Sequence, residues 1–413
     1  MIFVYYFFAA VLILLSYRSL VGGFRYLAFF RKELARPRSE YTPFVSVIAP
    51  YRGIDDGMPE NLAALFGQDF PEYEIIFVVD DESDPAVALV RTESNAGSPD
   101  GHPGRGVGSD RVNVRSRLVI APKAQDCSQK VENLREAVLL ADHRSEIYVF
   151  VDSDARPSSN WLRDLIAPLQ DDEVGATTGY RWFISKKPNF ASELNSVWNA
   201  SIASALGPNT SSNFCWGGSM AIRCDTFERL DMRTKWQGTL SDDFAVTRAM
   251  DEANMPIVFV PQAMAATLES CDLRQMLEFT TRQMKITRVY APSLWLMSFI
   301  GSGLFNVVMI ASLLIAIFSR SNGWQVAAAI TTLVLVSAFS IGKAYLRLKA
   351  VRLTLTQWDK ELRKQTFSQL TLFLLAPLIF FYNCFAAWLS RRMTWRGTTY
   401  VLKSNHETVI IAD

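Results

Sequence analysis

Two aspartates one residue apart, Asp152 and Asp154, follow the apolar run Ile147–Val151. In an extended segment, side chains at positions i and i+2 point to the same side, so both carboxylates would face one way. Two like charges on one side repel each other unless a positive group lies between them. A divalent cation that holds a sugar-nucleotide diphosphate would fill this place, whereas the plainer interpretation is a turn after a strand.

A second acidic pair, Asp80-Asp81, closes the apolar run Ile75–Val79, and Asp84-Pro85 follows it. These aspartates are either turn residues after a strand or hydrogen-bond acceptors for the base or ribose of a nucleotide.

The third acidic pair, Asp242-Asp243, follows Leu240-Ser241. One interpretation is a helix start, in which Ser241 caps the helix and the carboxylates lie in its first turn. The other is a general base, because a carboxylate near a second carboxylate has its pKa raised toward values useful for proton transfer.

A basic segment, Thr281–Tyr290, carries Arg282, Lys285 and Arg288 at three-residue steps along one helical face. These cations would either meet lipid headgroups beside a membrane segment or clamp a diphosphate leaving group.

Strand-like and helix-like runs alternate in the part of the chain that holds the acidic pairs. The expected strands are Val45–Ala49, Ile75–Val79, Leu118–Ala121 and Ile147–Val151, and the expected helices are Met58–Phe66 and Ser128–Ala141. This alternation predicts an α/β domain with a mostly parallel sheet, whose ligands bind at the carboxyl ends of the strands. The segment Asn95–Asp110, rich in Gly, Ser, Pro and Asp, is predicted to be a flexible insertion.

Four uncharged, largely apolar stretches predict a multi-pass integral membrane protein, since a spanning helix needs about 20 apolar residues. The stretches are Met1–Tyr17, Val289–Ser319, Ser321–Gly342 and Gln365–Ser390. The first is interpreted as an uncleaved anchor, because it lacks a basic start and a small-residue cleavage site. Pro377 in the fourth indicates a broken or re-entrant helix.

Basic residues after the first stretch predict that residues 44–290 face the cytoplasm. The side of the membrane on which the C-terminus lies is left open. Apolar residues at three- and four-residue steps in Ala344–Lys364, with basic residues between them, predict a helix in the membrane interface. A helix packed on the soluble domain is the alternative.

The composition excludes several function classes. The net charge of +1 argues against a nucleic-acid-binding protein. The five cysteines are odd in number and fit reduced cytoplasmic thiols. The three histidines lie far apart in sequence, which argues against zinc chemistry and a histidine-based triad.

The ordered set of motifs resembles the ceramide glucosyltransferase family of membrane-bound, inverting GT-A glycosyltransferases. The resemblance rests on the stretch Val45–Pro85 and on the segments KVENL (Lys130–Leu134), DSD (Asp152–Asp154) and GGSM (Gly217–Met220), followed by the third acidic pair and the basic helix. It implies a GT-A fold, Rossmann-like with a mostly parallel sheet, between N- and C-terminal transmembrane helices. It also implies a UDP-sugar donor, a lipid acceptor such as ceramide, and a divalent cation, Mn²⁺ or Mg²⁺.

The resemblance implies roles for individual residues. Asp243 would be the catalytic base, and Asp152 with Asp154 would hold the metal. The nucleotide-sugar site would use Pro50, Arg52, Asp81, Lys130, Asp152, Arg282 and Lys285, and the acceptor region Trp216, Gly217 and Asp242. The expected organisation is an anchor (1–24), a GT-A domain (42–290), a transmembrane hairpin (291–343), the interfacial helix (344–364), a transmembrane or re-entrant segment (365–390) and a basic tail (391–413).

The chain departs from the family at Lys285-Ile286, where relatives have Arg-Trp, and at Tyr51-Arg52, where they often have an apolar residue and Lys. Lysine keeps the charge but loses the bidentate fork, and isoleucine loses an aromatic platform. Alternatives that keep the fold are another UDP-hexose or another lipid acceptor, namely a hopanoid, a diacylglycerol or a polyprenyl phosphate. A processive polysaccharide synthase is disfavoured by Ile286, and a non-catalytic lipid-binding scaffold by the retained aspartates.

Overall fold

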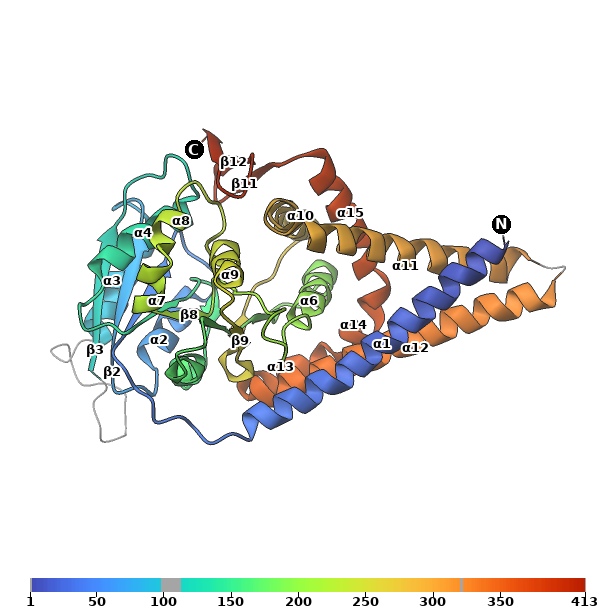
Figure 1. Ribbon diagram of the computed structural model, residues 1–413, viewed down its shortest axis with the longest axis horizontal. Helices are drawn as coiled ribbons and strands as arrows, with labels where there is room; N and C mark the ends of the chain where they lie inside the picture. The colour runs from blue at the N-terminus through green and yellow to red at the C-terminus, as the bar shows by residue number, and fades with distance from the viewer. Residues whose placement is uncertain (1, 98–112, 320–321, 413) are drawn as a thin grey trace. The chain divides into compact units, whose positions relative to one another are not determined.

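The structure is a computed structural model that describes residues 2–97, 113–319 and 322–412. Figure 1 shows the fold and labels many of its elements. The described residues form two compact units. We call residues 33–184, 205–269 and 392–412 the sheet unit, and the remaining described residues the helical unit. The predicted insertion 95–110 lies outside the described residues beyond Gly97.

A seven-stranded sheet with the order β3-β2-β1-β4-β8-β6-β9 organises the sheet unit. Its strands are β1 (Val45–Pro50), β2 (Glu72–Val79), β3 (Asn113–Ile120), β4 (Ile147–Phe150), β6 (Ala176–Thr178), β8 (Met220–Arg223) and β9 (Ile257–Phe259). All neighbours pair in parallel except β8, which is antiparallel to both β4 and β6. The prediction of an α/β fold with a mostly parallel sheet is therefore confirmed.

Two small sheets complete the β structure of this unit, with the orders β5-β10-β7 and β11-β12-β13. Their strands are β5 (Ala155–Arg156), β7 (Arg181–Phe183), β10 (Ala265–Thr267), β11 (Arg392–Trp395), β12 (Thr398–Leu402) and β13 (Thr408–Ala412). The last three lie in the segment that the sequence predicts only as a basic tail.

Short helices connect the strands. The α-helices are α2 (Met58–Phe66), α3 (Pro85–Gly97), α4 (Gln129–Ala137), α5 (Trp161–Ile166), α7 (Cys224–Arg229), α8 (Met232–Lys235) and α9 (Asp242–Glu252), and the 3₁₀-helices are η1 (Val138–Leu140), η2 (Ala167–Gln170) and η3 (Pro261–Ala263). The hydroxyl of Ser128 accepts a hydrogen bond from the backbone N–H of Val131 and so caps α4, which ends at Ala137, four residues before the predicted end.

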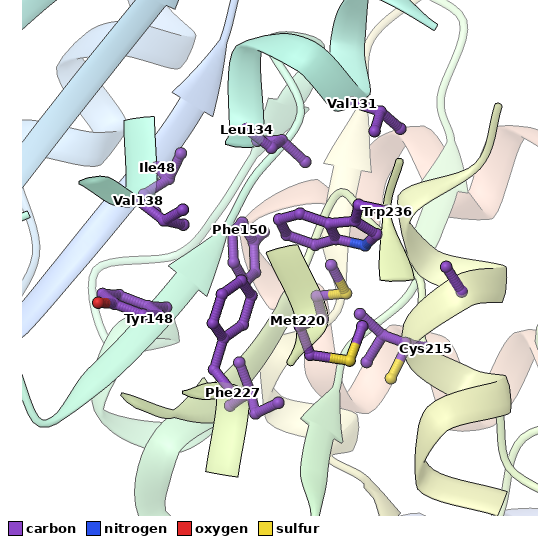
Figure 2. Close-up of a cluster of buried hydrophobic side chains, with 14 of the residues drawn as sticks. Ile48, Val131, Leu134, Val138, Tyr148, Phe150, Cys215, Met220, Phe227 and Trp236 are labelled. Atoms are coloured by element: carbon purple, nitrogen blue, oxygen red, sulfur yellow. The ribbon is translucent and has the colours of Figure 1, made fainter. Parts of the chain in front are cut away.

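An aromatic core lies between β4 and the helices α4 and α9 (Figure 2). The ring centroids of Phe150 and Trp236 are 5.4 Å apart, and those of Phe227 and Trp236 are 5.2 Å apart. Burial of each large side chain stabilises the fold by about 1.5–3 kcal/mol. Trp236 Nε1 also donates to the backbone carbonyl of Asp242, 3.1 Å away. This core therefore fixes the end of β4 and the start of α9, the two places that carry acidic motifs.

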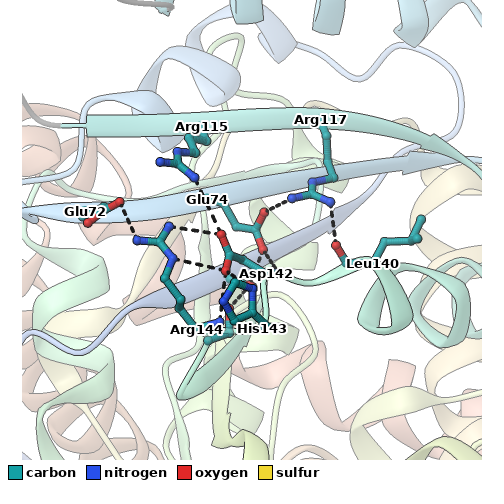
Figure 3. Close-up of polar contacts among 10 residues, drawn as sticks. Glu72, Glu74, Arg115, Arg117, Leu140, Asp142, His143 and Arg144 are labelled. Carbon is teal, nitrogen blue, oxygen red and sulfur yellow. Dashed lines mark hydrogen bonds and ion pairs between the residues drawn. The ribbon is translucent and has the colours of Figure 1, made fainter.

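A buried carboxylate, Glu74 on β2, is held by a polar cluster (Figure 3). It accepts hydrogen bonds from the Ser46 hydroxyl and the Asp142 backbone N–H, and it pairs with Arg117 on β3 at 2.8 Å. Arg144 binds Asp142 and Glu72 on the outer side of this cluster. Because every contact is to a neighbouring strand or loop, the cluster ties β1, β2 and β3 together rather than forming a site.

Helices long and apolar enough to cross a membrane lie in the helical unit. Within the part of the chain that the structure describes, three meet this description: α1 (Ile2–Leu34), α11 (Pro292–Phe318) and α12 (Gly323–Thr354). The pair Thr366–Leu374 and Ala376–Leu389 is apolar enough to be either a broken span or a re-entrant loop, and it is bent by 57° at the break just before Pro377. The bend fits the predicted broken or re-entrant helix. Exposed apolar side chains such as Phe3 and Val307 suit lipid contact.

The other helices of this unit are α6 (Phe190–Ala203), α10 (Leu273–Tyr290), η4 (Thr356–Trp358) and α13 (Asp359–Lys364), and the bent pair comprises α14 (Thr366–Thr371), η5 (Leu372–Leu374) and α15 (Ala376–Leu389). The predicted helix boundary at residue 344 is wrong, since α12 runs without a break to Thr354. Its apolar residues Leu348 and Val351 are buried inside the unit, so this face packs against protein.

Candidate active site

The carboxyl ends of β1, β2 and β4 lie at one edge of the sheet, because these strands are parallel neighbours. The segments that follow them contain Arg52, Asp80-Asp81 and Asp152. The sheet topology thus brings two of the three acidic pairs to one edge, as the sequence predicts.

Lys130, at the start of α4, links the acidic motifs. Its ammonium nitrogen lies 2.7 Å from Oδ1 of Asp152 and 3.0 Å from Oδ1 of Asp242. Burial alone would lower the pKa of Lys130, but the carboxylates of Asp152, Asp242 and Asp243 raise it above its ordinary value. Lys130 is therefore a fixed positive charge between the β4 motif and the α9 motif.

The motif Asp152–Asp154 does not continue β4 as an extended segment. It forms a turn in which the backbone N–H of Ala155 donates to the carbonyl of Asp152, 3.1 Å away. The prediction that extended geometry points both carboxylates to one side is wrong in this respect. The carboxylates instead meet two different cations, since Asp152 pairs with Lys130 and Asp154 Oδ2 lies 3.5 Å from Arg181.

Asp154 has the chemistry that a cation ligand needs. Burial raises the pKa of its carboxyl to about 7, with Arg181 opposing the rise and the neighbouring carboxylates adding to it. Its Oδ1 is buried and has no hydrogen-bond partner among the described residues. A divalent cation would satisfy this oxygen. The described residues contain no group of three or more His, Cys, Asp or Glu side chains that could hold a metal. A divalent cation bound by the carboxylates of Asp152 and Asp154 would thus need water and phosphate oxygens as its further ligands.

The acidic pair at the start of α9 divides into a buried and a partly exposed carboxylate. Asp242 is buried, its pKa is raised by burial to about 6, and Lys130 opposes that rise. Asp243 is partly exposed. Its Oδ1 accepts from the Ser241 hydroxyl and from the Phe244 backbone N–H at 2.8 Å, and its Oδ2 from the Gly217 N–H at 3.3 Å. Ser241 stands at the cap position, but its hydroxyl binds this carboxylate instead of capping the helix.

Gly217 lies against the carboxylate–lysine cluster. A Cβ atom there would stand 2.7 Å from Lys130 Nζ and would collide with Asp242 Oδ2. Next to it, the Trp216 ring is buried, with the Arg181 guanidinium 5.2 Å from its centroid. Trp216, Gly217 and Asp242, predicted as the acceptor region, are thus packed together around the cluster.

The pair after β2 is also divided. Asp80 is buried and binds Lys123 at 2.8 Å, whereas the Asp81 side chain is 49% exposed. The pKa of Asp81 is lowered by hydrogen bonds from the side chain and backbone of Ser83. Asp81 is therefore an ionised carboxylate at the sheet edge that a ligand can reach.

The other residues predicted for the nucleotide-sugar site lie at the end of β1, in the loop that follows it and on α10. Pro50 ends β1 and is buried. Arg52 lies in the next loop, where its guanidinium donates to the hydroxyl of Thr398 at 3.1 Å. Arg282 and Lys285 lie one turn apart on α10 of the helical unit, and Ile286 beside them is buried. Arg288 binds the carbonyls of Ala387 and Trp388, so its role is structural.

Two cations of this site are not predicted from the sequence. Arg181 has no flanking motif that marks it. Arg396 lies in the C-terminal turn and pairs with Asp55 at 2.6 Å, 341 residues away in sequence. The alternating buried residues Met393, Tyr400 and Leu402 around the Arg396-Gly397 dipeptide could have signalled a hairpin there.

Comparison with known proteins places the chain in a family. The model of Glycosyl transferase family 21 matches residues 11–408. A ceramide glucosyltransferase of Komagataella phaffii is 33% identical over 79 residues, a stretch that covers 19% of this chain and 15% of that relative.

Among solved structures, a mannosyltransferase from Pyrobaculum calidifontis in complex with GDP-Man and Mn²⁺ is 18% identical, with a TM-score of 0.42 over 91% of this chain and 99% of that one. A glucosyl-3-phosphoglycerate synthase from Mycobacterium tuberculosis in complex with Mn²⁺ and UDP-glucose is 13% identical, with a TM-score of 0.35 over 63% of this chain and 82% of that one. Because the family model spans nearly the whole chain, the protein belongs to glycosyl transferase family 21 and is a glycosyltransferase.

Proposed function

We propose that the protein is an inverting glycosyltransferase that moves glucose from UDP-glucose to the primary hydroxyl of ceramide. The observation that carries this proposal is the carboxylate–lysine cluster, in which Lys130 joins Asp152 to the residue before Asp243. In this proposal the cluster holds the base, Asp243, close to Lys130 and Asp152, which bind the diphosphate and its cation. The family supports the reaction class, and the likeness to a ceramide glucosyltransferase supports glucose and ceramide.

The nucleotide binds at the sheet edge in this proposal. Asp81 is ionised and half exposed, so it can accept hydrogen bonds from the ribose or the base. Pro50 and Arg52 form the start of the loop against which the nucleotide lies. Lys130 faces the diphosphate side of the site and lowers the free energy of negative charge there.

Asp154, with its unsatisfied buried oxygen, and Asp152 would hold the divalent cation. When bound, that cation supplies positive charge for the diphosphate leaving group. Turnover measured with Mn²⁺ and with Mg²⁺ in turn would show which of the two ions the site prefers.

Asp243 acts as the general base. Three donors, from Ser241, Phe244 and Gly217, fix its orientation and leave it partly exposed to the acceptor. It accepts the proton of the lipid hydroxyl while the hydroxyl oxygen bonds to the anomeric carbon. The bond from that carbon to the diphosphate oxygen breaks, and its electron pair leaves with the diphosphate. In-line attack inverts the configuration at the anomeric carbon.

For Arg282 and Lys285 of α10 we propose the role that the family resemblance implies, which is to stabilise the leaving group. A lysine at position 285 supplies charge without the two parallel hydrogen bonds of an arginine. Ile286 offers no aromatic face on which a growing sugar chain could stack, which favours transfer of a single sugar.

The apolar helices support a lipid acceptor. Three helices and one bent pair among the described residues are long and apolar enough to enter a membrane, and the acceptor hydroxyl of ceramide lies at headgroup level. The basic residues in the second half of α1 and just after it favour a cytoplasmic sheet unit by the positive-inside rule.

The test is product analysis with the full chain reconstituted in vesicles. Vesicles that contain ceramide, diacylglycerol, a hopanoid or a polyprenyl phosphate are incubated with Mn²⁺ and one of several UDP-hexoses, and the lipids are analysed by mass spectrometry. We expect one hexose on ceramide with UDP-glucose. A hexose on another lipid would show that this lipid, and not ceramide, is the acceptor. The absence of any glycolipid while UDP and Mn²⁺ still bind would refute lipid glycosylation.

A further inference from the structure

The C-terminal hairpin of the sheet unit carries a residue in an unfavourable conformation. Strands β11 and β12 are joined by the two residues Arg396 and Gly397, whose φ angles are 50° and 88°. Such two-residue turns favour Asn-Gly or Gly-Gly, and a long side chain in the left-handed region costs about 1 kcal/mol or more. The backbone gains nothing from an arginine here, so the contacts of the arginine side chain must account for its presence at this position.

The Arg396 guanidinium binds the loop that follows β1. One nitrogen lies 2.6 Å from Oδ1 of Asp55, and another donates to the backbone carbonyl of Arg52 at 3.1 Å. The Arg52 guanidinium in turn donates to the Thr398 hydroxyl. The turn and the loop are thus joined in both directions.

Asp55 also contacts the Asp152–Asp154 turn, which is the proposed metal site. Its Oδ2 accepts a hydrogen bond from the hydroxyl of Ser153, the residue between Asp152 and Asp154. The loop is also tied to the segment after β2, because the Gly53 N–H donates to the Asp84 carboxylate at 2.9 Å. Arg396 therefore lies two contacts from the turn that presents both carboxylates.

The hairpin itself is firmly seated on the sheet unit. Tyr400 is buried, and its hydroxyl accepts from the backbone N–H of Gln129 at 3.4 Å, directly before Lys130. The carbonyl of His406 fills the space that a Cβ on Gly238 would take. His406 Nε2 also lies 2.9 Å from an Arg248 guanidinium nitrogen on α9. The small sheet β11-β12-β13 is thus held at α4 through Tyr400 and at α9 through the turn between β12 and β13, so its β11–β12 hairpin can act as a fixed support for the loop.

We propose that the C-terminal hairpin is part of the donor site and that Arg396 is a positioning residue, which holds Asp55 and thereby the 51–57 loop and the Asp152–Asp154 turn. This rests on the proposed function only in naming the ligand as a nucleoside diphosphate with a divalent cation. Without Arg396 the loop loses its support, so donor binding weakens more than the chemical step.

The experiment compares the full-length protein with Arg396→Ala, Arg396→Lys and the control Lys403→Ala. Lys403 lies just beyond β12, and its ion pair with Glu407 stays inside the small sheet. Calorimetry measures UDP binding with Mn²⁺. Loss of an outer support of a metal site typically costs about 10- to 100-fold in affinity, which is the effect expected for Arg396→Ala. Arg396→Lys can reach only one of the two acceptors and should fall between, and Lys403→Ala should match the wild type.

Hydrogen exchange of the ligand-free proteins supplies a second readout. Peptides covering residues 51–57 and 152–155 should exchange faster in Arg396→Ala, and the wild-type rate should return partly in Arg396→Lys. In steady state the donor KM should rise with a smaller change in kcat.

Unchanged exchange and unchanged UDP affinity in Arg396→Ala would overturn the inference. If Arg396→Ala does not fold, Asp55→Asn removes the same ion pair from the loop side, and wild-type exchange in its 152–155 peptide would overturn it equally. Failure of the wild type to bind UDP would count against the proposed function, while the exchange data would still decide the role of Arg396.

Discussion

The ammonium group of Lys130 lies 3.0 Å from a carboxylate oxygen of Asp242, the residue directly before the proposed base Asp243. The same nitrogen contacts Asp152 at 2.7 Å. One lysine thus forms ion pairs with both acidic motifs that the proposed reaction needs close together.

Replacing Lys130 by methionine should lower both stability and activity. Two buried or half-buried carboxylates would lose their counter-ion, which typically costs about 3–5 kcal/mol of unfolding free energy. The exposed pair of Lys235 and Glu252 provides the control, because Lys235→Met should cost about 1 kcal/mol or less. Thermal unfolding measures both.

The Lys130→Met variant should also shift the pH dependence. Burial raises the pKa of Asp242 to about 6 while Lys130 opposes the rise, so the pKa climbs further in the variant. A raised carboxyl pKa gives stability that is present below the unfolded value of 3.8 and lost as the pH rises through the folded value. The variant should therefore be more destabilised at about pH 8 than at about pH 5, which thermal unfolding at the two pH values measures. Equal destabilisation at both pH values would contradict this role of Lys130.

Asp243→Asn should reduce kcat with little change in donor affinity. An amide keeps the shape but cannot accept the hydroxyl proton, and general base catalysis contributes about 100- to 10,000-fold. Asp251→Asn, on the same helix α9 but at its exposed end, is the control and should retain activity. Turnover at saturating donor and acceptor measures the effect. Near-normal turnover of Asp243→Asn would show that Asp243 is not the general base.

Asp154→Asn should separate stability from ligand binding. Burial disfavours the charged carboxylate, so the amide should raise the thermal midpoint in the presence of a chelator, yet Mn²⁺-dependent UDP binding should be lost. Asp164 on α5 is a matched control, because burial raises its pKa to about 6 as well. Asp164→Asn should gain stability and still bind UDP. Intact Mn²⁺-dependent binding by Asp154→Asn would exclude Asp154 as a metal ligand.

Gly217→Ala should impair the site without changing any charge. The added Cβ would collide with Asp242 and crowd Lys130, displacing both from the arrangement described above. At Gly207, in the same unit, a Cβ meets no atom within 4 Å, so Gly207→Ala should behave like the wild type. We expect at least a 10-fold loss of kcat/KM for Gly217→Ala, because even small misplacement of reacting groups is costly. Equal activity of the two variants would contradict the packing around Lys130.

Two of the acidic pairs were predictable as neighbours because each follows an apolar run that forms a strand. In a parallel sheet the carboxyl ends of neighbouring strands share an edge, so Asp80-Asp81 and Asp152 had to meet there once the alternation of elements was recognised. The fold class followed from the same alternation. The apolar stretches likewise predicted the helices that can cross a membrane.

Contacts between residues distant in sequence leave no local trace, and there the sequence was insufficient. Neither Arg181 beside Asp154 nor Arg396 beside Asp55 could be assigned from neighbouring residues. The turn at Asp152–Asp154 is set by the backbone bond from Ala155 rather than by strand geometry. The helix α12 continues past residue 344 because its apolar face is buried against the helical unit, so amphipathic spacing alone did not mark an end.

The measurement that tests the central claim most directly is the anomeric configuration of the first product formed by the reconstituted protein. The wild type and Asp243→Asn are supplied with UDP-glucose, Mn²⁺ and ceramide vesicles, and the glycolipid is analysed by proton NMR. Single displacement from the α-linked donor predicts β-linked glucosylceramide from the wild type and almost none from Asp243→Asn. An α-linked product, or equal product from the two proteins, would contradict inverting transfer with Asp243 as the base.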